Sequence, residues 1–268
     1  MDRRRLSRLL GRTSVEVPAI GMGTWRTFDT DEDRRPLVEV AIESGVDLFD
    51  SSPMYGRAET TLSRALEGVR ERVVVATKIW TAGAEEGERQ ADHALRLFGH
   101  VDIYQVHNLL NVPVQLALLE RLKREGKVRA VGATHYQESA FPDMAALMKS
   151  KRLDMVQIPY NPLRRTAERE LLPLAESMGL GVLVMSPLQH GILDRRPSPA
   201  QLEELGVSTW AQAVLKWVAS DPRVSAVLTA TQQEDHVREN ASAGDVPFFT
   251  HEQRDLVVRI AEHSRAAG

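Results

Sequence analysis

Short apolar runs alternate with amphipathic segments along almost the whole chain. The runs contain few charges and lack the polar-apolar alternation of a half-exposed strand, which is typical of parallel strands covered on both faces. Eight of them are predicted strands: residues 18–25, 46–50, 73–78, 101–107, 128–134, 155–160, 181–185 and 224–229. In the first run, Gly21 and Gly23 are expected to leave room for another group to approach the backbone.

The amphipathic segments between these runs predict helices. We expect a first helix that Asp31 or Asp33 caps and that ends near Ser44, and a C-terminal cap at Gly179 for a later one. The other helices are expected near residues 58–67, 85–98, 113–125, 138–150, 167–178, 208–219, 234–242 and 250–265.

Eight strand-helix units in about 250 residues predict an α/β fold, a closed (β/α)8 TIM barrel. We expect one domain over residues 1–268, with a short N-terminal hairpin at residues 6–17 as a cap and the active site at the C-terminal face of the strands. An open doubly wound sheet is the competing fold, but the first strand-helix turn lacks G-x-G-x-x-G. The longest irregular stretch, residues 188–199, is expected to be a flap on the active-site face.

Composition narrows the function classes. The net charge of -3 gives no electrostatic case for nucleic acid or an anionic membrane, and no run of about 18 apolar residues exists. There is no cysteine, so thiolate chemistry is excluded. A basic cluster (Arg3, Arg4, Arg5, Arg8) is interpreted as a solvated arm, because no apolar signal-peptide core follows it. A cytoplasmic enzyme is the default expectation.

Four polar residues follow three successive predicted strands. Asp50 ends one strand and Tyr55 lies just beyond it, while Lys78 and His107 end the next two. In a barrel all strands point their C-terminal ends to one face, so these side chains should converge there.

These residue types suit proton transfer. A tyrosine has an ordinary pKa near 10, and an ammonium group within about 4–6 Å can lower it by roughly 1–3. We therefore expect Tyr55 to be the proton donor and Lys78 to lower its pKa. Asp50 would hold Lys78 charged, and His107 would orient a substrate oxygen.

Each residue alone has a structural interpretation, as a helix cap, an ion-pair partner or a packing side chain. A metal centre is the main rival for clustered Asp and His, but no H-x-H or H-E-x-x-H is present. We expect no metal. A glycosidase ranks low because no two carboxylates at strand ends clearly pair. The G-x-S-x-G motif of a serine nucleophile is also absent from the sequence.

At these residues the sequence resembles the aldo-keto reductase family. The resemblance covers nearly the whole chain, and it is specific through the order and spacing of its segments. They are Gly21-Met-Gly-Thr-Trp25, the segment from Asp50 through Tyr55 to Gly56, Ala76-Thr-Lys78, Tyr104-Gln-Val-His107, Gly126-Lys-Val-Arg-Ala-Val-Gly132, Gln157-Ile-Pro-Tyr-Asn-Pro162, Ser186-Pro-Leu188 and Glu239-Asn240.

The resemblance implies an NADPH-dependent, or NADH-dependent, reductase of small aldehydes or ketones on a (β/α)8 barrel. The family's catalytic Asp, Tyr, Lys and His match Asp50, Tyr55, Lys78 and His107. It further implies cofactor contacts by Gly23, Thr24 and Asp50 at the nicotinamide and its ribose, Thr134, His135 and Gln157 at the carboxamide, Ser186, Leu188 and Gly191 at the pyrophosphate, and Thr231, Glu239 and Asn240 at the adenosine.

The chain departs from the family pattern in several places. Thr134-His135 stands where Ser-Asn is common, and Met185 where an aromatic residue usually stacks on the nicotinamide. Ala230 and His236 replace the basic residues that commonly hold the 2′-phosphate, for which Arg238 is a candidate substitute.

The segment after Lys78 is short, so we expect an open substrate pocket. Its expected walls are Trp25, Trp80 and Asn108, and a core role remains the alternative for both tryptophans.

Three functions stay open at this point. The first is a carbonyl reductase with a small-molecule substrate. The second is a nicotinamide-binding sensor or regulatory subunit, and the third is a redox-neutral enzyme on the same fold. The substrate, the direction of reaction and the oligomeric state do not follow from the sequence.

Overall fold

The computed structural model describes residues 7–189 and 191–263. Eight parallel strands close into a barrel in the order β10-β3-β4-β5-β6-β7-β8-β9, which confirms the predicted (β/α)8 fold and excludes the open sheet. The strands are β3 (Ile20–Gly23), β4 (Leu48–Asp50), β5 (Val74–Ile79), β6 (Val101–His107), β7 (Val128–Thr134), β8 (Met155–Pro159), β9 (Gly181–Met185) and β10 (Ala226–Thr229).

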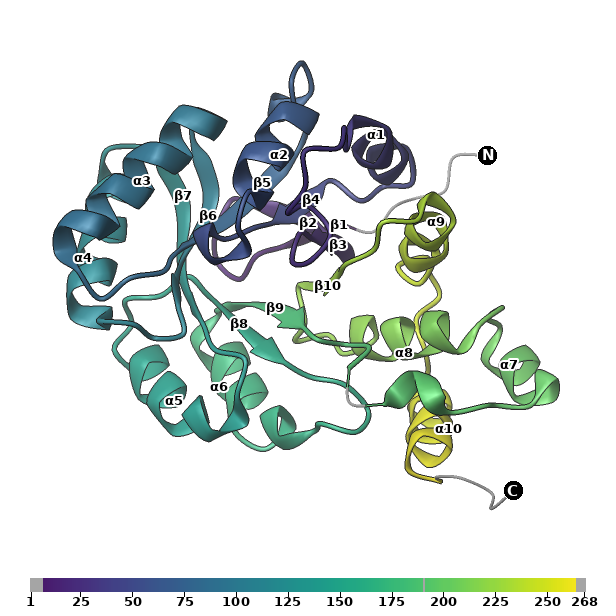
Figure 1. Cartoon of the computed structure of the whole chain (residues 1–268). Helices are drawn as coiled ribbons and strands as arrows, with labels where there is room; N and C mark the ends of the chain where they lie inside the picture. The colour runs from purple at the N-terminus through teal and green to yellow at the C-terminus, as the bar shows by residue number, and fades with distance from the viewer. Residues whose placement is uncertain (1–6, 190, 264–268) are drawn as a thin grey trace.

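Helices surround the barrel in an outer ring (Figure 1). Several end as the sequence predicts; Gly179, for instance, closes its helix with a positive φ of 64°. The helices are α1 (Arg35–Glu43), α2 (Ala58–Ala65), α3 (Ala84–Phe98), α4 (Val112–Arg124), α5 (Phe141–Lys149), α6 (Leu171–Met178), α7 (Pro199–Leu205), α8 (Trp210–Ala219), α9 (Glu234–Ser242) and α10 (His251–Glu262).

The predicted hairpin is present as β1 (Ser7–Leu9) paired antiparallel with β2 (Glu16–Pro18). Its side chains Leu10, Val15 and Val17 are fully buried and join the apolar cluster inside the barrel. The hairpin therefore seals the end of the barrel where the strands begin. Leu6 and three residues of the predicted arm, Arg3, Arg4 and Arg5, lie outside the described residues. The fourth, Arg8, is not solvated as predicted, because its guanidinium donates to the carbonyls of Val224 at 2.6 Å and Ala219 at 2.8 Å.

Three local predictions need correction. Arg34, not an aspartate, is the N-cap of α1; Asp33 accepts a hydrogen bond from the Arg35 amide, and Asp31 instead pairs with Arg57. The predicted helices at 138–150 and 167–178 each begin with a separate 3-10 turn, Glu138–Ala140 and Thr166–Glu168.

The stretch after β9 is also more ordered than predicted. It contains a 3-10 turn, Ile192–Asp194, and beyond it the helix α7, which was not predicted. The signal was present in the sequence, because Ser198 and Gln201 form a capping box at the start of α7.

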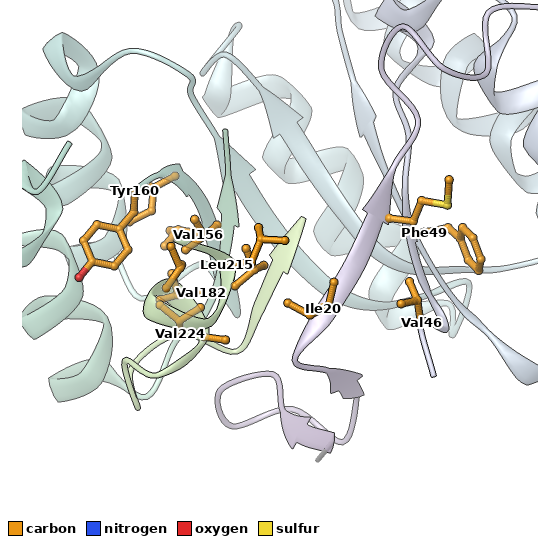
Figure 2. Packing of buried hydrophobic residues seen from close by; sticks show 14 of the residues in the cluster. Ile20, Val46, Phe49, Val156, Tyr160, Val182, Leu215 and Val224 are labelled. Atoms are coloured by element: carbon orange, nitrogen blue, oxygen red, sulfur yellow. The ribbon is translucent and has the colours of Figure 1, made fainter. Parts of the chain in front are cut away.

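The described residues form two apolar cores. The larger one lies between the strands and the helices, where Ile20, Phe49, Val156, Val182 and Leu215 pack (Figure 2). The smaller one fills the barrel interior above the hairpin and contains Leu48, Ala76, Ile103, Ala130, Met155, Leu183, Ala226 and Leu228. Within the described part of the chain, no helix has both the length and the apolar character needed to cross a bilayer.

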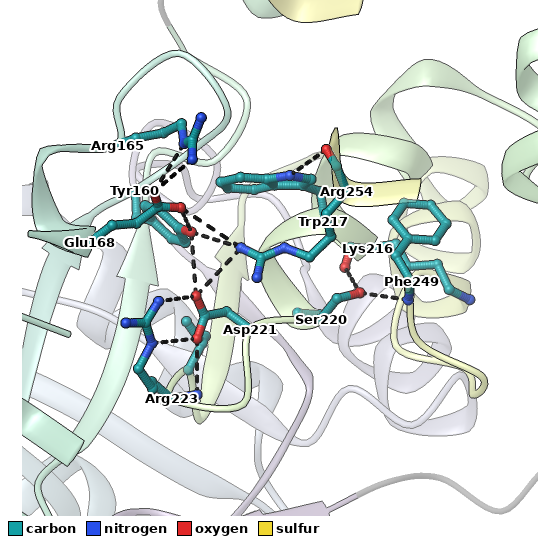
Figure 3. Close-up of polar contacts among 12 residues, drawn as sticks. Tyr160, Arg165, Glu168, Lys216, Trp217, Ser220, Asp221, Arg223, Phe249 and Arg254 are labelled. Atoms are coloured by element: carbon teal, nitrogen blue, oxygen red, sulfur yellow. Dashed lines mark hydrogen bonds and ion pairs between the residues drawn. The ribbon is translucent and has the colours of Figure 1, made fainter. Parts of the chain in front are cut away.

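A buried ionic network joins the end of α8 to β8 and α10 (Figure 3). Asp221 is fully buried and accepts hydrogen bonds from Arg223 at 2.8 and 2.7 Å and from Arg254 at 3.4 Å. Arg254 also donates to the hydroxyl of Tyr160 at 2.9 Å, and Tyr160 donates to Glu168 at 2.5 Å. This network ties the last helix to the barrel wall.

We expect Asp221→Asn to destabilise the protein by about 3 kcal/mol, because Arg223 loses its carboxylate and Arg254 is left with the more distant Glu168, at 3.9 Å. Burial opposes ionisation, but the bonds and charge of Arg223 hold the pKa of Asp221 below its ordinary value. The network's contribution is therefore full at neutral pH and is lost as pH falls through that lowered pKa.

Urea unfolding between pH 3 and 7 measures this contribution. The variant should lose stability at pH 7 and show a flatter acid dependence than wild type. Asp235→Asn, at a solvated ion pair on α9, is the matched control. Equal losses in both variants would contradict the expected role of the network.

Candidate active site

Polar side chains lie above the apolar core of the barrel interior, toward the C-terminal ends of the strands. Because side chains alternate between the two faces of a strand, residues two positions apart both point into the barrel. In this chain, an apolar inward residue is followed on the same face by a polar one nearer the C-terminal end of the strand. Leu48 is thus followed by Asp50, and Ala76 by Lys78. Gln105 of β6 and Gln157 of β8 reach Asp50 from other strands of the barrel.

Asp50 and Lys78 form a buried ion pair. Lys78 Nζ donates to Asp50 Oδ2 and to the carbonyl of Ser51, both at 2.7 Å, and the Lys78 side chain is 1% exposed. Burial works against the ammonium, but the charge of Asp50 and its hydrogen bond oppose that effect, and the pKa of Lys78 is raised. Lys78 is therefore a fixed cation at working pH, as predicted.

Tyr55 closes a 3-10 turn that starts at Pro53 and that Ser52 caps through the amide of Met54. This turn brings the tyrosine ring back over the strand ends. Lys78 Nζ lies 5.2 Å from the centre of the Tyr55 ring.

Lys78 lowers the pKa of Tyr55 as predicted, but it does not set the net direction of the shift. Burial raises the pKa of Tyr55, and the nearby charge of Lys78 opposes that rise without reversing it. The negative charge of Asp50 adds to the increase. Burial is therefore the main cause of the raised pKa, and the charge of Asp50 offsets part of the field that Lys78 exerts on the phenol.

His107 lies beside Tyr55 with the two rings edge to face and their centres 6.0 Å apart. Its Nδ1 is 2.9 Å from Ser52 Oγ. Burial, together with the charge of Lys78, lowers the pKa of His107 to about 3. The imidazole is therefore neutral at physiological pH, and it serves as a hydrogen-bonding group rather than as a cation.

The four residues singled out from the sequence thus meet at one end of the barrel. Two residues without a predicted role, Gln105 and Ser52, also belong to this cluster. Gln105 donates to Asp50 Oδ1 at 3.2 Å, and Ser52 contacts His107. Gln105 lies two positions before His107 on the same strand, a spacing that placed it on the inner face.

The residues expected at the nicotinamide end of a cofactor surround this cluster. A Cβ atom on Gly23 would meet only the carbonyl of Thr229, 3.6 Å away, so the space above Gly23 is open. Thr24 is buried and donates to the carbonyl of Asp50. The expected space at Gly21 is filled, because the side chains of Leu48 and Leu228 occupy it.

Thr134 and Gln157 are direct neighbours across β7 and β8. Thr134 Oγ1 and Gln157 Oε1 are buried and have no hydrogen-bond partner among the described residues. His135 uses Nδ1 to accept from the amide of Gln137 at 3.1 Å, which leaves Nε2 with the proton when the ring is neutral. The ring stacks on Tyr136, with centres 5.4 Å apart.

The residues expected along the cofactor's phosphates lie after β9. Met185 and Leu188 are half-buried. Ser186 has a positive φ of 57°, and its carbonyl accepts from Asn161. Gly191 also has a positive φ, of 69°, and begins the 3-10 turn of this loop.

The residues expected at the adenosine lie before and on α9. Thr231 Oγ1 accepts from the Gln233 amide, and Asn240 is buried. Glu239 accepts from Thr209 of the α8 N-cap, so its carboxylate already has a partner.

The two basic candidates near this end are both exposed. Arg238 pairs with Glu234 at 3.4 Å and with Asp235 at 3.5 Å. His236 lies on the same helix. The ion pairs of Arg238 favour the interpretation as a solvated helix charge.

The expected substrate walls follow β3, β5 and β6. Trp25 and Trp80 are 40% and 41% exposed, which excludes a core role for either ring. Arg26 covers the ring of Trp25 at 4.2 Å, and Gln90 holds the backbone of Trp80 on both sides. Asn108 has a positive φ of 52° at the turn after His107. No group of acidic or histidine side chains in the described residues could hold a metal ion.

Comparison with known proteins finds relatives in sequence and in fold. The chain is 28% identical to methylglyoxal reductase YeaE of Escherichia coli, over 89% of each chain. It is 30% identical to the NADH-specific methylglyoxal reductase of Escherichia coli, over 69% of this chain and 68% of that one. An aldo/keto reductase from Klebsiella pneumoniae, solved in complex with NADP and acetate, superimposes with a TM-score of 0.81 at 25% identity, with 97% of each chain covered. The model of the Aldo/keto reductase family matches residues 19–262, so this chain belongs to that family.

Proposed function

We propose that the protein reduces a small aldehyde or ketone to an alcohol with NADPH, or with NADH, at the C-terminal face of a single barrel domain. The observation that carries the proposal is the buried Lys78–Asp50 pair at 2.7 Å, with Tyr55 and His107 beside it. The activities for which the two bacterial methylglyoxal reductases are named support the same reaction class.

The residues at the strand ends fit a nicotinamide. A carboxamide both donates and accepts hydrogen bonds, and the unpaired Thr134 Oγ1 and Gln157 Oε1 are suited to bind it. The open space at Gly23 admits a flat ring against the backbone. When bound, the reduced cofactor supplies the hydride, and the protein supplies position and electrostatics.

The side chains around the carbonyl divide the remaining work. Tyr55 gives its proton to the carbonyl oxygen as negative charge develops there. Lys78 stabilises the resulting phenolate, and Asp50 fixes Lys78 in place. If Ser52 donates to His107 Nδ1, the neutral ring keeps its proton on Nε2 and offers it to the same substrate oxygen.

Ser186, Leu188 and Gly191 would hold the pyrophosphate, and Thr231, Glu239 and Asn240 the adenosine. Met185 would pack against the nicotinamide as a thioether rather than as a flat ring. Arg238 is already paired with two carboxylates, and Ala230 carries no charge. These positions should therefore add little to the binding of the 2′-phosphate that distinguishes NADPH from NADH. We therefore propose that NADH is accepted alongside NADPH.

Oxidation of NADPH and of NADH, followed by absorbance with small aldehydes, ketones and 2-oxoaldehydes such as methylglyoxal, tests the proposal. We expect turnover with both cofactors, with less than about tenfold preference, since one solvated arginine contributes about 1 kcal/mol or less. Cofactor binding by fluorescence without turnover of any carbonyl would instead favour the sensor or redox-neutral function.

A cytoplasmic location of the protein stays a prediction.

A further inference from the structure

Ser52 is a fully buried serine that contacts both the turn carrying the proton donor and the histidine of the site. It lies just after β4, its backbone is extended, and it is 0% exposed. Its Oγ accepts from the amide of Met54 at 3.2 Å, and its carbonyl accepts from the amide of Tyr55 at 3.0 Å. The same Oγ lies 2.9 Å from His107 Nδ1. One hydroxyl group is therefore shared between the turn and the imidazole.

The bond between Ser52 and His107 has two possible directions, which differ in where the hydroxyl proton goes. A serine oxygen carries one proton and two lone pairs, and the amide of Met54 uses one lone pair. If His107 Nδ1 donated to the other, the hydroxyl proton would be buried without an acceptor, because Oγ has no third partner among the described residues. An unpaired buried donor is costly, so the hydroxyl donates to Nδ1.

This direction fixes the position of the ring proton. Burial, followed by the charge of Lys78, lowers the pKa of His107 to about 3, so the imidazole is neutral. A neutral imidazole that accepts at Nδ1 carries its proton on Nε2. Within residues 7–189 and 191–263, Nε2 has no hydrogen-bond partner, which leaves its N–H available to a substrate oxygen.

We propose that Ser52 is a positioning residue of this reductase, which holds His107 in the tautomer that donates from Nε2. The inference rests on the proposed function. A carbonyl oxygen that receives a proton from Tyr55 is oriented by a second donor on the neighbouring ring. The opposite tautomer would present a lone pair at Nε2 and would repel that oxygen, so the hydroxyl of Ser52 decides whether the ring attracts the substrate.

Nitrogen-15 NMR of the histidine rings at neutral pH tests the tautomer without turnover. The chemical shift of a ring nitrogen differs widely between its protonated and unprotonated forms, and the signals of His107 are those missing from His107→Ala. Wild type should show a protonated Nε2 and an unprotonated Nδ1. Ser52→Ala should move both signals toward the average of the two tautomers, whereas Ser52→Thr, which keeps the hydroxyl, should retain the wild-type spectrum. A proton on Nδ1 in wild type would overturn the inference.

Reduction kinetics measure what the fixed tautomer contributes. Loss of the hydrogen bond that orients the ring should lower kcat/KM in Ser52→Ala by about three- to tenfold, with cofactor affinity near the wild-type value. The variant also removes the side-chain cap of the turn, although the bond from the Tyr55 amide to the carbonyl of residue 52 remains.

A double-mutant cycle separates the ring from the turn. In a His107→Ala background, Ser52→Ala should cost less than about twofold, because the group through which Ser52 acts is already absent. An equally large loss in both backgrounds would mean that Ser52 acts only through the turn, which is incompatible with the proposal.

Ser225→Ala is the matched control, because Ser225 is also buried and its Oγ also accepts from a backbone amide, that of Val182 at 3.2 Å. Ser225 directly precedes β10, at the other end of the barrel, so this variant should keep the wild-type kinetics and spectrum. No turnover by wild type would overturn the proposed function and the inference together. Turnover by wild type with an unchanged spectrum in Ser52→Ala would overturn the inference alone.

Discussion

Tyr55→Phe is expected to lower the rate of carbonyl reduction by about 10²- to 10⁴-fold, the usual contribution of a general acid. The variant removes one oxygen and keeps the ring that packs beside His107 and the larger apolar core. Cofactor affinity should therefore stay near the wild-type value. Single-turnover kinetics together with fluorescence titration of NADPH separate the loss of chemistry from any loss of binding.

The matched control for this variant is Tyr136→Phe. Tyr136 follows β7 on the same face of the barrel, is 54% exposed and stacks on His135. The control should keep reductase activity, because more than half of this side chain is exposed. Wild-type turnover in Tyr55→Phe would exclude Tyr55 as the proton donor, whatever the behaviour of the control.

Lys78→Met should have the next largest effect, a loss of about 10²- to 10³-fold in kcat/KM. Removal of the ammonium leaves burial and Asp50 to raise the pKa of Tyr55 further. The alkaline limb of the profile should accordingly move to higher pH. Because the pKa of Lys78 is itself raised, its stabilising charge is constant at neutral pH and is lost only above its ordinary value, so the shift reports on Tyr55.

Two further variants separate the electrostatic role of Lys78 from its structural role. Lys78→Met leaves the buried carboxylate of Asp50 without a cation, which costs roughly 3–5 kcal/mol of stability. Adding Asp50→Asn should restore stability but not activity. Lys216→Met is the control, because it removes another buried lysine, whose ammonium donates to the carbonyl of Asp245. This variant should keep the wild-type pH profile. A wild-type pH profile in Lys78→Met would refute the proposed tuning of Tyr55.

The barrel and the central cluster could be predicted because their signals are local. Each strand is a short apolar run, and Asp50, Lys78 and His107 stand where such runs end. Once the strands are parallel, convergence of these side chains follows from topology alone. The family resemblance pointed independently to the same residues.

Properties that depend on summed fields or on tertiary packing could not be predicted in this way. The pKa of Tyr55 depends on the balance between burial, Lys78 and Asp50, and the sequence shows only that these groups are near one another. The space expected beside Gly21 is another example, because the side chains of Leu48 and Leu228 fill it and the sequence does not show which side chains meet there. The solvated state of Arg238 likewise depends on the rotamers of its acidic neighbours.

The alternation of inward and outward side chains on each strand makes this site sensitive to the parity of insertions and deletions. A single residue deleted between Val74 and Thr77 would turn Lys78 toward the helices and place Ile79 at its inward position, so one missing codon would replace the central cation by an apolar side chain. The same deletion in the loop after Met185 would leave every strand in register. Length variation among homologues should therefore concentrate in the loops, while strand segments change by substitution only.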